Sequence, residues 1–325
     1  MADASKKERI FITGGSGYVG SVIVEFAIAD GYEVYGLSRS EAGDEKLKKL
    51  GAVPVRGDLT SVDVLRRESA VADIVIHLAD PFSLNPSDGY DKVIEIQKGV
   101  ADAFADSMQG TNKPLVTTTG VLIVGADPNR NETNEESPLP EDPFVPRHHV
   151  EAYDQNLAKK GIRVSTIRLA MYVYGRGGSG AKMLMGAAAR NGFSICVDEG
   201  DNYVTPVHVD DAARLYLLAA KKAKAGSIFN ATSTTDLKFR EIADAIGEVI
   251  HVPVKSLTAE EATQTLGPVF SKFLRSENRS SSVKAKKELG WEIKEKVSII
   301  DEIKSGSYVA LAKEILSGAA NVSGH

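Results

Sequence analysis

The chain has 325 residues, of which 42% are hydrophobic and 26% charged, and its 39 basic and 44 acidic side chains give a formal charge of −5. This composition excludes a wholly disordered chain, because there is ample apolar material for a core. The single cysteine, Cys196, excludes a disulfide framework and a cysteine-cluster metal site, so we expect no metal. The acidity argues against nucleic acid as a partner, and no apolar run reaches the roughly 20 residues of a membrane span. The polar N-terminus has no apolar segment behind it, so we expect no secretory signal and a cytoplasmic protein.

Short apolar runs alternate with helical patterns through the first half of the chain. The apolar runs predict strands at residues 9–13, 33–37, 52–55, 73–78, 115–118 and 163–169, with one more at 227–231. Amphipathic patterns between them predict helices, among them residues 21–30, 91–108 and 149–160. Strands that alternate with helices are typical of βαβ units. The sequence therefore predicts an α/β fold with a Rossmann-type doubly wound parallel sheet that is buried on both faces.

Two segments interrupt this alternation and suggest the domain organisation. Residues 127–146 hold five prolines and predict a long surface loop, of the kind that often carries function. Residues 175–180 are rich in glycine and predict a flexible joint. We expect a Rossmann-type domain over residues 1–175, to which the chain returns at about 204–232. Residues 176–203 and 233–325 are expected to form mainly a smaller, mixed substrate-binding cap.

A glycine-rich turn follows the first predicted strand and precedes the first predicted helix. It reads Thr-Gly-Gly-Ser-Gly-Tyr-Val-Gly over residues 13–20. Glycines at this spacing permit a tight turn, close backbone approach to a pyrophosphate and close packing of the helix on the strand. The helix N-terminus also offers unpaired N–H groups to an anion. We therefore expect this turn to bind a dinucleotide through Gly14, Gly17, Tyr18, Val19 and Gly20.

The end of the second predicted strand indicates which dinucleotide is preferred. A site for NAD carries an acidic residue about 20 residues past the glycines, where it binds the ribose 2′-hydroxyl. Ser38 and Arg39 stand at this position instead. A hydroxyl and a guanidinium suit a 2′-phosphate, since arginine can bind phosphate with paired donors. The sequence therefore favours NADP(H) as the cofactor, with NAD less favoured.

Six short motifs follow one another in a fixed order along the chain. They are the glycine turn, Gly-Asp-Leu at 57–59, His-Leu-Ala at 77–79, Val-Tyr-Gly at 173–175, Val-His-Val-Asp-Asp-Ala-Ala at 207–213 and the run 284–291 that ends in Leu-Gly-Trp. In this order they resemble the short-chain dehydrogenase/reductase superfamily, in its extended branch of epimerases and dehydratases. The resemblance implies that Asp58 and Leu59 lie beside the adenine and that Leu78 and Ala79 line the cofactor site.

The acid–base pair of that superfamily is a tyrosine with a lysine four residues later, a spacing that places both on one helix face. None of the ten tyrosines here has a lysine at that position. If Glu151 is aligned with an acidic family position, Pro143 replaces the tyrosine and Arg147 the lysine. A shift by one residue gives Phe144 and His148 instead. We expect Arg147 to contact the cofactor ribose and supply a fixed positive charge at the catalytic site, but not to transfer protons.

Other residues remain candidates for substrate orientation and proton transfer. Thr119, or its neighbour Thr118, matches the family's hydroxyl position after the fifth strand and could hydrogen-bond a substrate carbonyl or hydroxyl. His148 and His149 are candidates for proton transfer, because histidine is the residue type whose charge changes most readily near neutral pH. Tyr153 follows His149 by four residues and shares its predicted helix face. We therefore expect Thr119 to orient the substrate oxygen, and His148, His149, Tyr153 or water to handle the proton in place of the missing pair.

Three functions fit these features. The first is an atypical NADP(H)-dependent oxidoreductase that acts on a small carbonyl or alcohol substrate. The second is an epimerase- or dehydratase-like enzyme that keeps its cofactor bound without net redox turnover. The third is an NADP(H)-sensing regulatory protein, as some relatives without the tyrosine–lysine pair are. The titratable residues retained beside the site favour an enzyme. Its expected partner is a small-molecule substrate, with neither nucleic acid nor membrane, and the resemblance leaves a homodimer open.

Overall fold

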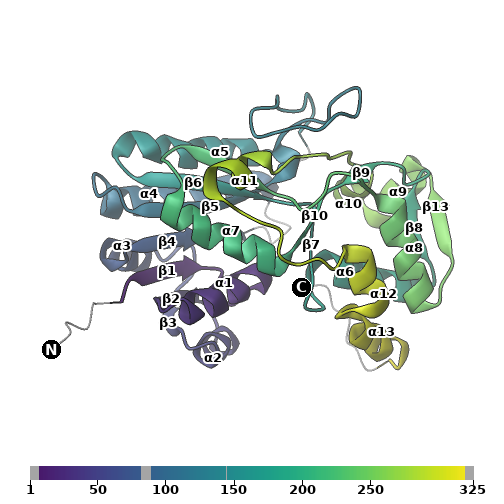
Figure 1. Cartoon of the computed structure of the whole chain (residues 1–325), viewed down its shortest axis with the longest axis horizontal. Helices are drawn as coiled ribbons and strands as arrows, with labels where there is room; N and C mark the ends of the chain where they lie inside the picture. Colours follow the sequence, from purple (N-terminus) through teal and green to yellow (C-terminus); the bar gives the residue numbers. More distant parts are fainter. Residues whose placement is uncertain (1–6, 82–88, 144, 319–325) are drawn as a thin grey trace.

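The computed structural model describes residues 7–81, 89–143 and 145–318. At its centre lies a seven-stranded parallel sheet, as the sequence predicts (Figure 1). Its strands are β1 (Arg9–Thr13), β2 (Glu33–Ser38), β3 (Val53–Arg56), β4 (Ile74–His77), β5 (Pro114–Gly120), β6 (Arg163–Leu169) and β11 (Ser227–Ala231). They lie in the order β11-β6-β5-β4-β1-β2-β3. The order from β3 to β6 is that of a dinucleotide-binding Rossmann fold, to which β11 adds one edge strand.

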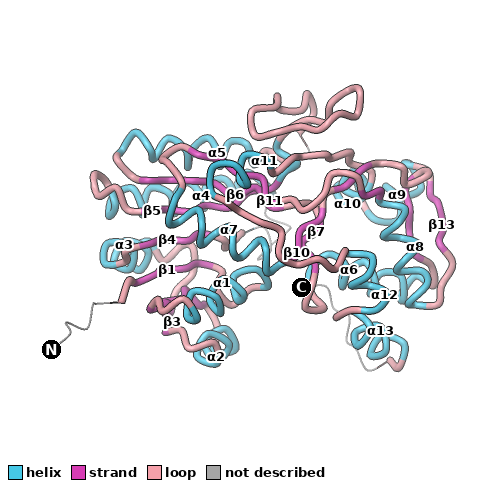
Figure 2. Tube along the Cα trace, in the orientation of Figure 1, coloured by secondary structure: helices cyan, strands magenta, loops and turns pink. Residues whose placement is uncertain are grey.

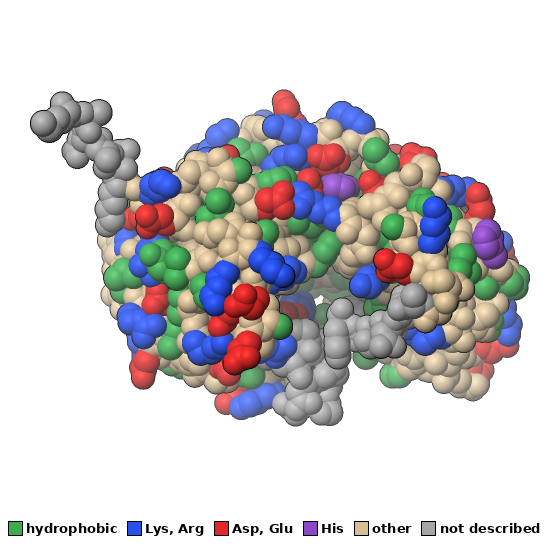
Figure 3. Space-filling model, turned by 90° about the horizontal axis from the view of Figure 1, so that it is seen from below, with side chains coloured by type: hydrophobic (Ala, Val, Ile, Leu, Met, Phe, Trp, Pro, Cys, Tyr) green, Lys and Arg blue, Asp and Glu red, His purple; other side chains and the backbone are tan. Residues whose placement is uncertain are grey.

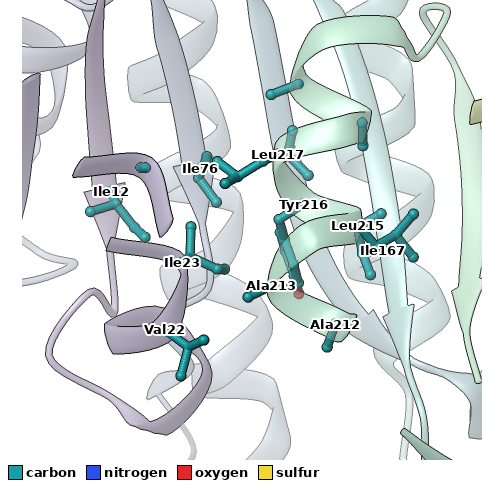
Figure 4. Close-up of a cluster of buried hydrophobic side chains, with 14 of the residues drawn as sticks. Ile12, Val22, Ile23, Ile76, Ile167, Ala212, Ala213, Leu215, Tyr216 and Leu217 are labelled. Carbon is teal, nitrogen blue, oxygen red and sulfur yellow. The ribbon is translucent and has the colours of Figure 1, made fainter. Parts of the chain in front are cut away.

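Helices cover both faces of the sheet, because successive strand residues point to opposite sides. Ile10 and Ile12 of β1 pack in the core on one face, whereas Phe11 between them packs on the other. The first face is covered by α1 (Tyr18–Ala29), α2 (Glu41–Lys49) and α7 (Val209–Lys222), and the second by α3 (Val62–Val71), α4 (Gly89–Met108) and α5 (Arg147–Gln155). Figure 4 shows the first face, where side chains of β1, β4 and β6 meet those of α1 and α7.

The boundaries of the helices differ from the predicted ones where the chain supplies a cap. Helix α1 begins at Tyr18, three residues earlier than predicted, with Gly17 as its N-cap residue. Helix α5 begins at Arg147, directly after Pro146, because a proline tolerates this position where no intrahelical N–H partner is needed. It ends at Gln155 and continues as a 3-10 turn over Asn156–Lys160.

A second hydrophobic core lies beside the sheet (Figure 1). Its helices are α6 (Ser179–Asn191), α8 (Phe239–Ile250), α9 (Ala259–Leu266), α10 (Pro268–Leu274), α12 (Ile299–Ser305) and α13 (Tyr308–Leu316). Short strand pairs join β7 (Tyr172–Tyr174) to β10 (Pro206–His208), β8 (Ser194–Val197) to β13 (Val254–Leu257), and β9 (Tyr203–Val204) to β12 (Leu237–Lys238). On the face seen in Figure 3, a hollow opens between the two halves, and charged side chains of both signs are interspersed around it.

The chain returns from the second core to the sheet twice. The first return brings α7 and β11. The second brings α11 (Val283–Leu289) and Trp291, which pack in the first core although they fall in the part expected to be mainly cap. Trp291 Nε1 donates to the carbonyl oxygen of Asp211 at 2.9 Å. The C-terminal third is therefore divided between two cores.

The described residues of the proline-rich segment 127–146 have little regular structure, as predicted (Figure 2). It is nevertheless anchored at several points. Thr133 forms a β-bridge with Ser280, and Arg130 pairs with Asp201 and Glu277. These contacts join the loop to segments that are about 70 to 150 residues away in the chain. Within the described residues, no helix is both long and apolar enough to cross a membrane.

Candidate functional site

A groove of about 530 Å³ runs along the carboxyl ends of β1, β2 and β3. Ligands of open α/β sheets bind at this edge, where the strand order reverses. Most of the predicted cofactor residues line the groove: Gly14, Gly17, Ser38, Arg39, Asp58, Leu59, Leu78 and Ala79. They come from four separate chain segments that the parallel sheet brings to one edge.

The glycine turn approaches other backbone segments so closely that side chains are excluded. Gly14 has a φ of +77°, and a Cβ atom there would lie 2.9 Å from Ala79 N. A Cβ atom at Gly20 would lie 2.1 Å from Gly14 O. Gly17 caps α1 without a side-chain hydrogen bond, so the first N–H groups of the helix have no side-chain acceptor there. This turn fits the pyrophosphate of a dinucleotide, because backbone donors and a helix N-terminus face the groove.

Three predicted cofactor residues of the glycine turn do not line the groove. Tyr18 and Val19 pack against the core beneath α1, and the hydroxyl of Tyr18 donates to Gly175 O at 2.6 Å. Gly20 is buried against the turn itself. Because α1 already begins at Tyr18, the helix directs these residues toward the protein interior. They support the turn from behind.

The end of the groove beyond β2 is positively charged. Arg39 and Lys46 are exposed and line it, and neither forms an ion pair with any described residue. The sequence analysis did not identify Lys46 as a cofactor residue. Ser40 is the N-cap of α2 and accepts a hydrogen bond from Gly43 N, which starts the helix at a point where Lys46 lies in the groove lining with Arg39. Ser38 was expected to meet a 2′-phosphate, but its buried hydroxyl donates to Ser40 O at 3.0 Å.

Asp58 lies in the lining of the groove as an ionised carboxylate. Its Oδ1 atom accepts hydrogen bonds from Thr60 N, Thr60 Oγ1 and Ser61 Oγ. These bonds hold the pKa of Asp58 below its usual range. The carboxylate therefore fixes the turn after β3.

A second cavity of about 300 Å³ opens at the carboxyl ends of β4, β5 and β6. It shares Leu78, Ala79 and Asp80 with the groove, so the two spaces adjoin. Thr119 and Arg147, both expected in catalysis, line this second cavity. Asp80, which was missed in the sequence, forms an ion pair with Arg147.

The threonine hydroxyls at the end of β5 already have acceptors for their protons. Thr119 Oγ1 donates to Glu151 Oε2 at 2.8 Å. Thr118 Oγ1 donates to the carbonyl oxygen of His77 at 2.9 Å. The hydroxyl of Tyr216 donates to Thr118 Oγ1 at 2.8 Å. One of them, Thr119 or Thr118, was expected to hydrogen-bond a substrate carbonyl or hydroxyl. In this arrangement they can accept a hydrogen bond from a hydroxyl, but their protons are not directed at a carbonyl.

The structure does not bring His148, His149 and Tyr153 to the cavity. The hydroxyl of Tyr153 donates to Asp102 Oδ1 of α4 at 2.8 Å, and His149 is exposed. His148 lies beside His149, with 4.0 Å between the ring centroids, and its pKa is lowered by partial burial and by that neighbour. The physical reason is helix geometry: six residues after Arg147 the helix has turned by roughly 240°, so Tyr153 faces α4 while Arg147 faces the cavity. Phe144, the alternative in the shifted alignment, lies outside the described residues.

Residues 10–232 match the NAD dependent epimerase/dehydratase family. The chain belongs to this family. An uncharacterized protein of Schizosaccharomyces pombe is 36% identical over 87% of this chain and 94% of its own length. Sterol-4-alpha-carboxylate 3-dehydrogenase, decarboxylating, of Dictyostelium discoideum is 28% identical over 72% of this chain and 74% of its own length. The solved structure of UDP-glucose 4-epimerase from Thermotoga maritima superposes with a TM-score of 0.72 and 21% identity, covering 94% of this chain and 99% of that one.

These similarities fix the class of the protein. It is an enzyme with a Rossmann-type NAD(P)-binding fold and an activity of the epimerase, dehydratase or reductase type. The groove and the second cavity adjoin at the carboxyl edge of the sheet, which is the edge where open α/β sheets bind ligands.

Proposed function

We propose that this enzyme is an NADP(H)-dependent oxidoreductase that acts on a small carbonyl compound or the corresponding secondary alcohol. One observation carries the proposal: the groove that ends at Arg39 and Lys46 continues through Leu78, Ala79 and Asp80 into a cavity lined by Arg147 and Thr119. A bound nicotinamide dinucleotide supplies or accepts the hydride.

The preference for NADP(H) rests on charge. Arg39, just after β2, and Lys46 of α2 line the groove without an ion-pair partner among the described residues. The Oδ1 atom of Asp58 accepts its hydrogen bonds from its own turn. A 2′-phosphate would give both cations a counterion, and charge-assisted bonds to phosphate are stronger than neutral ones. A ribose 2′-hydroxyl would offer them nothing comparable.

Within the cavity the residues of this chain orient and enclose the substrate. Arg147, held by Asp80, supplies a fixed positive charge beside the cofactor ribose. Thr119 Oγ1, whose proton is directed to Glu151, accepts a hydrogen bond from an alcohol substrate. His77 lines the cavity, but burial lowers its pKa to about 4. At neutral pH its ring is therefore neutral and has no extra proton to donate. The proton of a reduction therefore enters from water.

The test is cofactor turnover by the purified protein. NADPH or NADH is supplied with a panel of aldehydes and ketones, and the loss of reduced-cofactor absorbance is followed. We expect consumption of NADPH in preference to NADH. Cofactor that copurifies with the protein and is never consumed would instead favour an epimerase- or dehydratase-like reaction. NADPH binding with no turnover of any carbonyl or sugar would favour a sensor.

A further inference from the structure

The walls of the second cavity are predominantly apolar. Its apolar side chains include Leu122, Ile123, Val145, Leu169, Met171 and Phe273. Resting on the proposed function, we propose that the substrate is a neutral, apolar carbonyl compound or its secondary alcohol, without phosphate, carboxylate or sugar, and that Phe273 of α10 limits its length. An apolar wall of this kind contributes binding free energy in proportion to the apolar surface that the substrate buries.

The charges in the cavity leave no counterion for an anionic substrate. Arg147 is the only permanently cationic side chain among the described lining residues, and Asp80 pairs with it. His77 is neutral, because burial lowers its pKa far below its usual value. A carboxylate or phosphate that entered would lose its hydration without gaining a cation of its own, which costs several kcal/mol in an apolar site.

The polar groups of the cavity also fit a substrate with few hydroxyls. Gln97 donates to Ala79 O at 3.2 Å, and its Oε1 atom lies 2.7 Å from His77 Nε2. Thr118 and Thr119 direct their protons to the protein, as described above. A sugar ring would bring several hydroxyls that need partners, and each one left unsatisfied lowers the affinity. A ketone brings a single acceptor.

Phe273 is the contribution of the second core to this cavity. The other lining residues lie between His77 and Met171, so only Phe273 comes from the C-terminal third of the chain. Its ring lies 5.6 Å from that of Tyr172 and is stacked on Phe270 at 6.2 Å between centroids. Tyr172 is fully buried. This packing restricts the ring of Phe273, so it forms a firm wall where a chain of methylene groups would extend.

Levulinic acid and its methyl ester test the charge argument, since they differ only in the carboxylate. For the ester we expect a kcat/KM at least about tenfold higher than for the acid, which corresponds to about 1.4 kcal/mol. The same pair is also compared by the thermal shift that each produces in the protein–NADP⁺ complex. A Met171→Arg variant, at a half-buried wall position, should raise the relative kcat/KM for the acid. Equal use of acid and ester, or a nucleoside diphosphate sugar as the best ligand, would overturn the proposal.

Linear methyl ketones from butanone to nonanone test the role of Phe273. The Phe273→Ala variant should move the chain-length optimum toward longer ketones and lower kcat/KM for short ones severalfold. Val269→Ala is the matched control, because Val269 lies on the same helix, is 52% exposed and does not line the cavity. An unchanged optimum in Phe273→Ala would refute the assignment. If no ketone consumes NADPH, the proposed function fails, and the thermal shifts still decide whether the cavity prefers the ester.

Discussion

The imidazole of His77 accepts a hydrogen bond from the hydroxyl of Thr13, with 2.6 Å between Nδ1 and Oγ1. Its Nε2 atom faces Gln97 Oε1, an acceptor, at 2.7 Å, so Nε2 carries the single proton of the neutral ring. Gln97 donates to Ala79 O, and Ala79 N–H donates to Thr13 Oγ1. These bonds form a closed ring. It fixes the peptide group of Ala79, which lines both the cofactor groove and the second cavity.

This ring predicts that the protein loses stability in mild acid. Burial lowers the pKa of His77 from 6.5 to about 4 in the folded state. The unfolded state therefore binds more protons between these values, so the free energy of unfolding falls as the pH falls from about 6.5 to about 4. The contribution of His77 to this loss is on the order of 3 kcal/mol. Urea denaturation of wild type and His77→Phe across this range measures it.

The variant separates the histidine from other acid-sensitive groups. His77→Phe should be less stable than wild type at neutral pH, because Thr13 and Gln97 lose their partners, but its stability should depend less on pH. His251→Asn is the control, because His251 is exposed and asparagine tolerates its left-handed backbone conformation. Equal pH dependence in wild type and His77→Phe would contradict the assigned protonation state.

Asp154 predicts that stability falls as the pH rises, the opposite of the effect of His77. This carboxyl is buried beneath α5, hydrogen-bonds Thr117 and lies near Glu151, and burial raises its pKa from 3.8 to about 8. The folded state thus retains a proton that the unfolded state has lost, so this group destabilises the fold as the pH rises from about 4 to about 8. We expect Asp154→Asn to be more stable than wild type at pH 7, by up to about 4 kcal/mol. The two proteins should converge near pH 4, and thermal unfolding at both values tests this.

Arg39 and Lys46 predict the cofactor selectivity. Removal of Arg39 deletes a charge-assisted contact worth about 1.5–3 kcal/mol, so Arg39→Ala should weaken NADPH binding by roughly 10- to 100-fold and leave NADH nearly unchanged. Lys46→Ala should act in the same direction and more weakly. Fluorescence titration with both cofactors measures the two dissociation constants. Lys49→Ala is the control, because Lys49 lies on the same helix and does not line the groove. If Arg39→Ala weakens both cofactors equally, the 2′-phosphate assignment is wrong.

The buried ion pair between Glu151 and Arg168 predicts a large loss of stability. Arg168 Nη2 donates to Glu151 Oε1 at 2.6 Å and its Nε to Oε2 at 2.9 Å, and both side chains are at most 7% exposed. Glu151→Ala leaves a buried guanidinium without its carboxylate and should cost about 3–5 kcal/mol. Chemical denaturation measures the loss. Glu95→Ala, which breaks an exposed pair with Lys92, should change stability by less than about 1 kcal/mol. Comparable effects of the two variants would contradict the buried character of the Glu151 pair.

Much of the cofactor half could be predicted because its signals are local. The glycine turn, the apolar runs and the polar end of β2 each lie within a few residues. In the glycine turn, the backbone conformation and close contacts exclude residues with a side chain. Gly14 and Gly20 are examples, since a Cβ atom at either would collide with backbone. The seven strands were therefore found at nearly their observed bounds, and the groove residues from Gly14 to Ala79 follow from the parallel sheet.

The substrate half could not be predicted in the same way, because its contacts join distant segments. The sequence placed His149 and Tyr153 on one helix face correctly, but only the packing of α5 against α4 decided that this face turns away from the cavity. Asp80 and Phe273 are 193 residues apart, and no local pattern marks either as a cavity residue. The sequence by itself determined the sheet, the glycine turn and the charge at the end of β2. Tertiary structure decided which side chains meet at the substrate cavity, since that depends on how two cores pack and not on the preferences of any one segment.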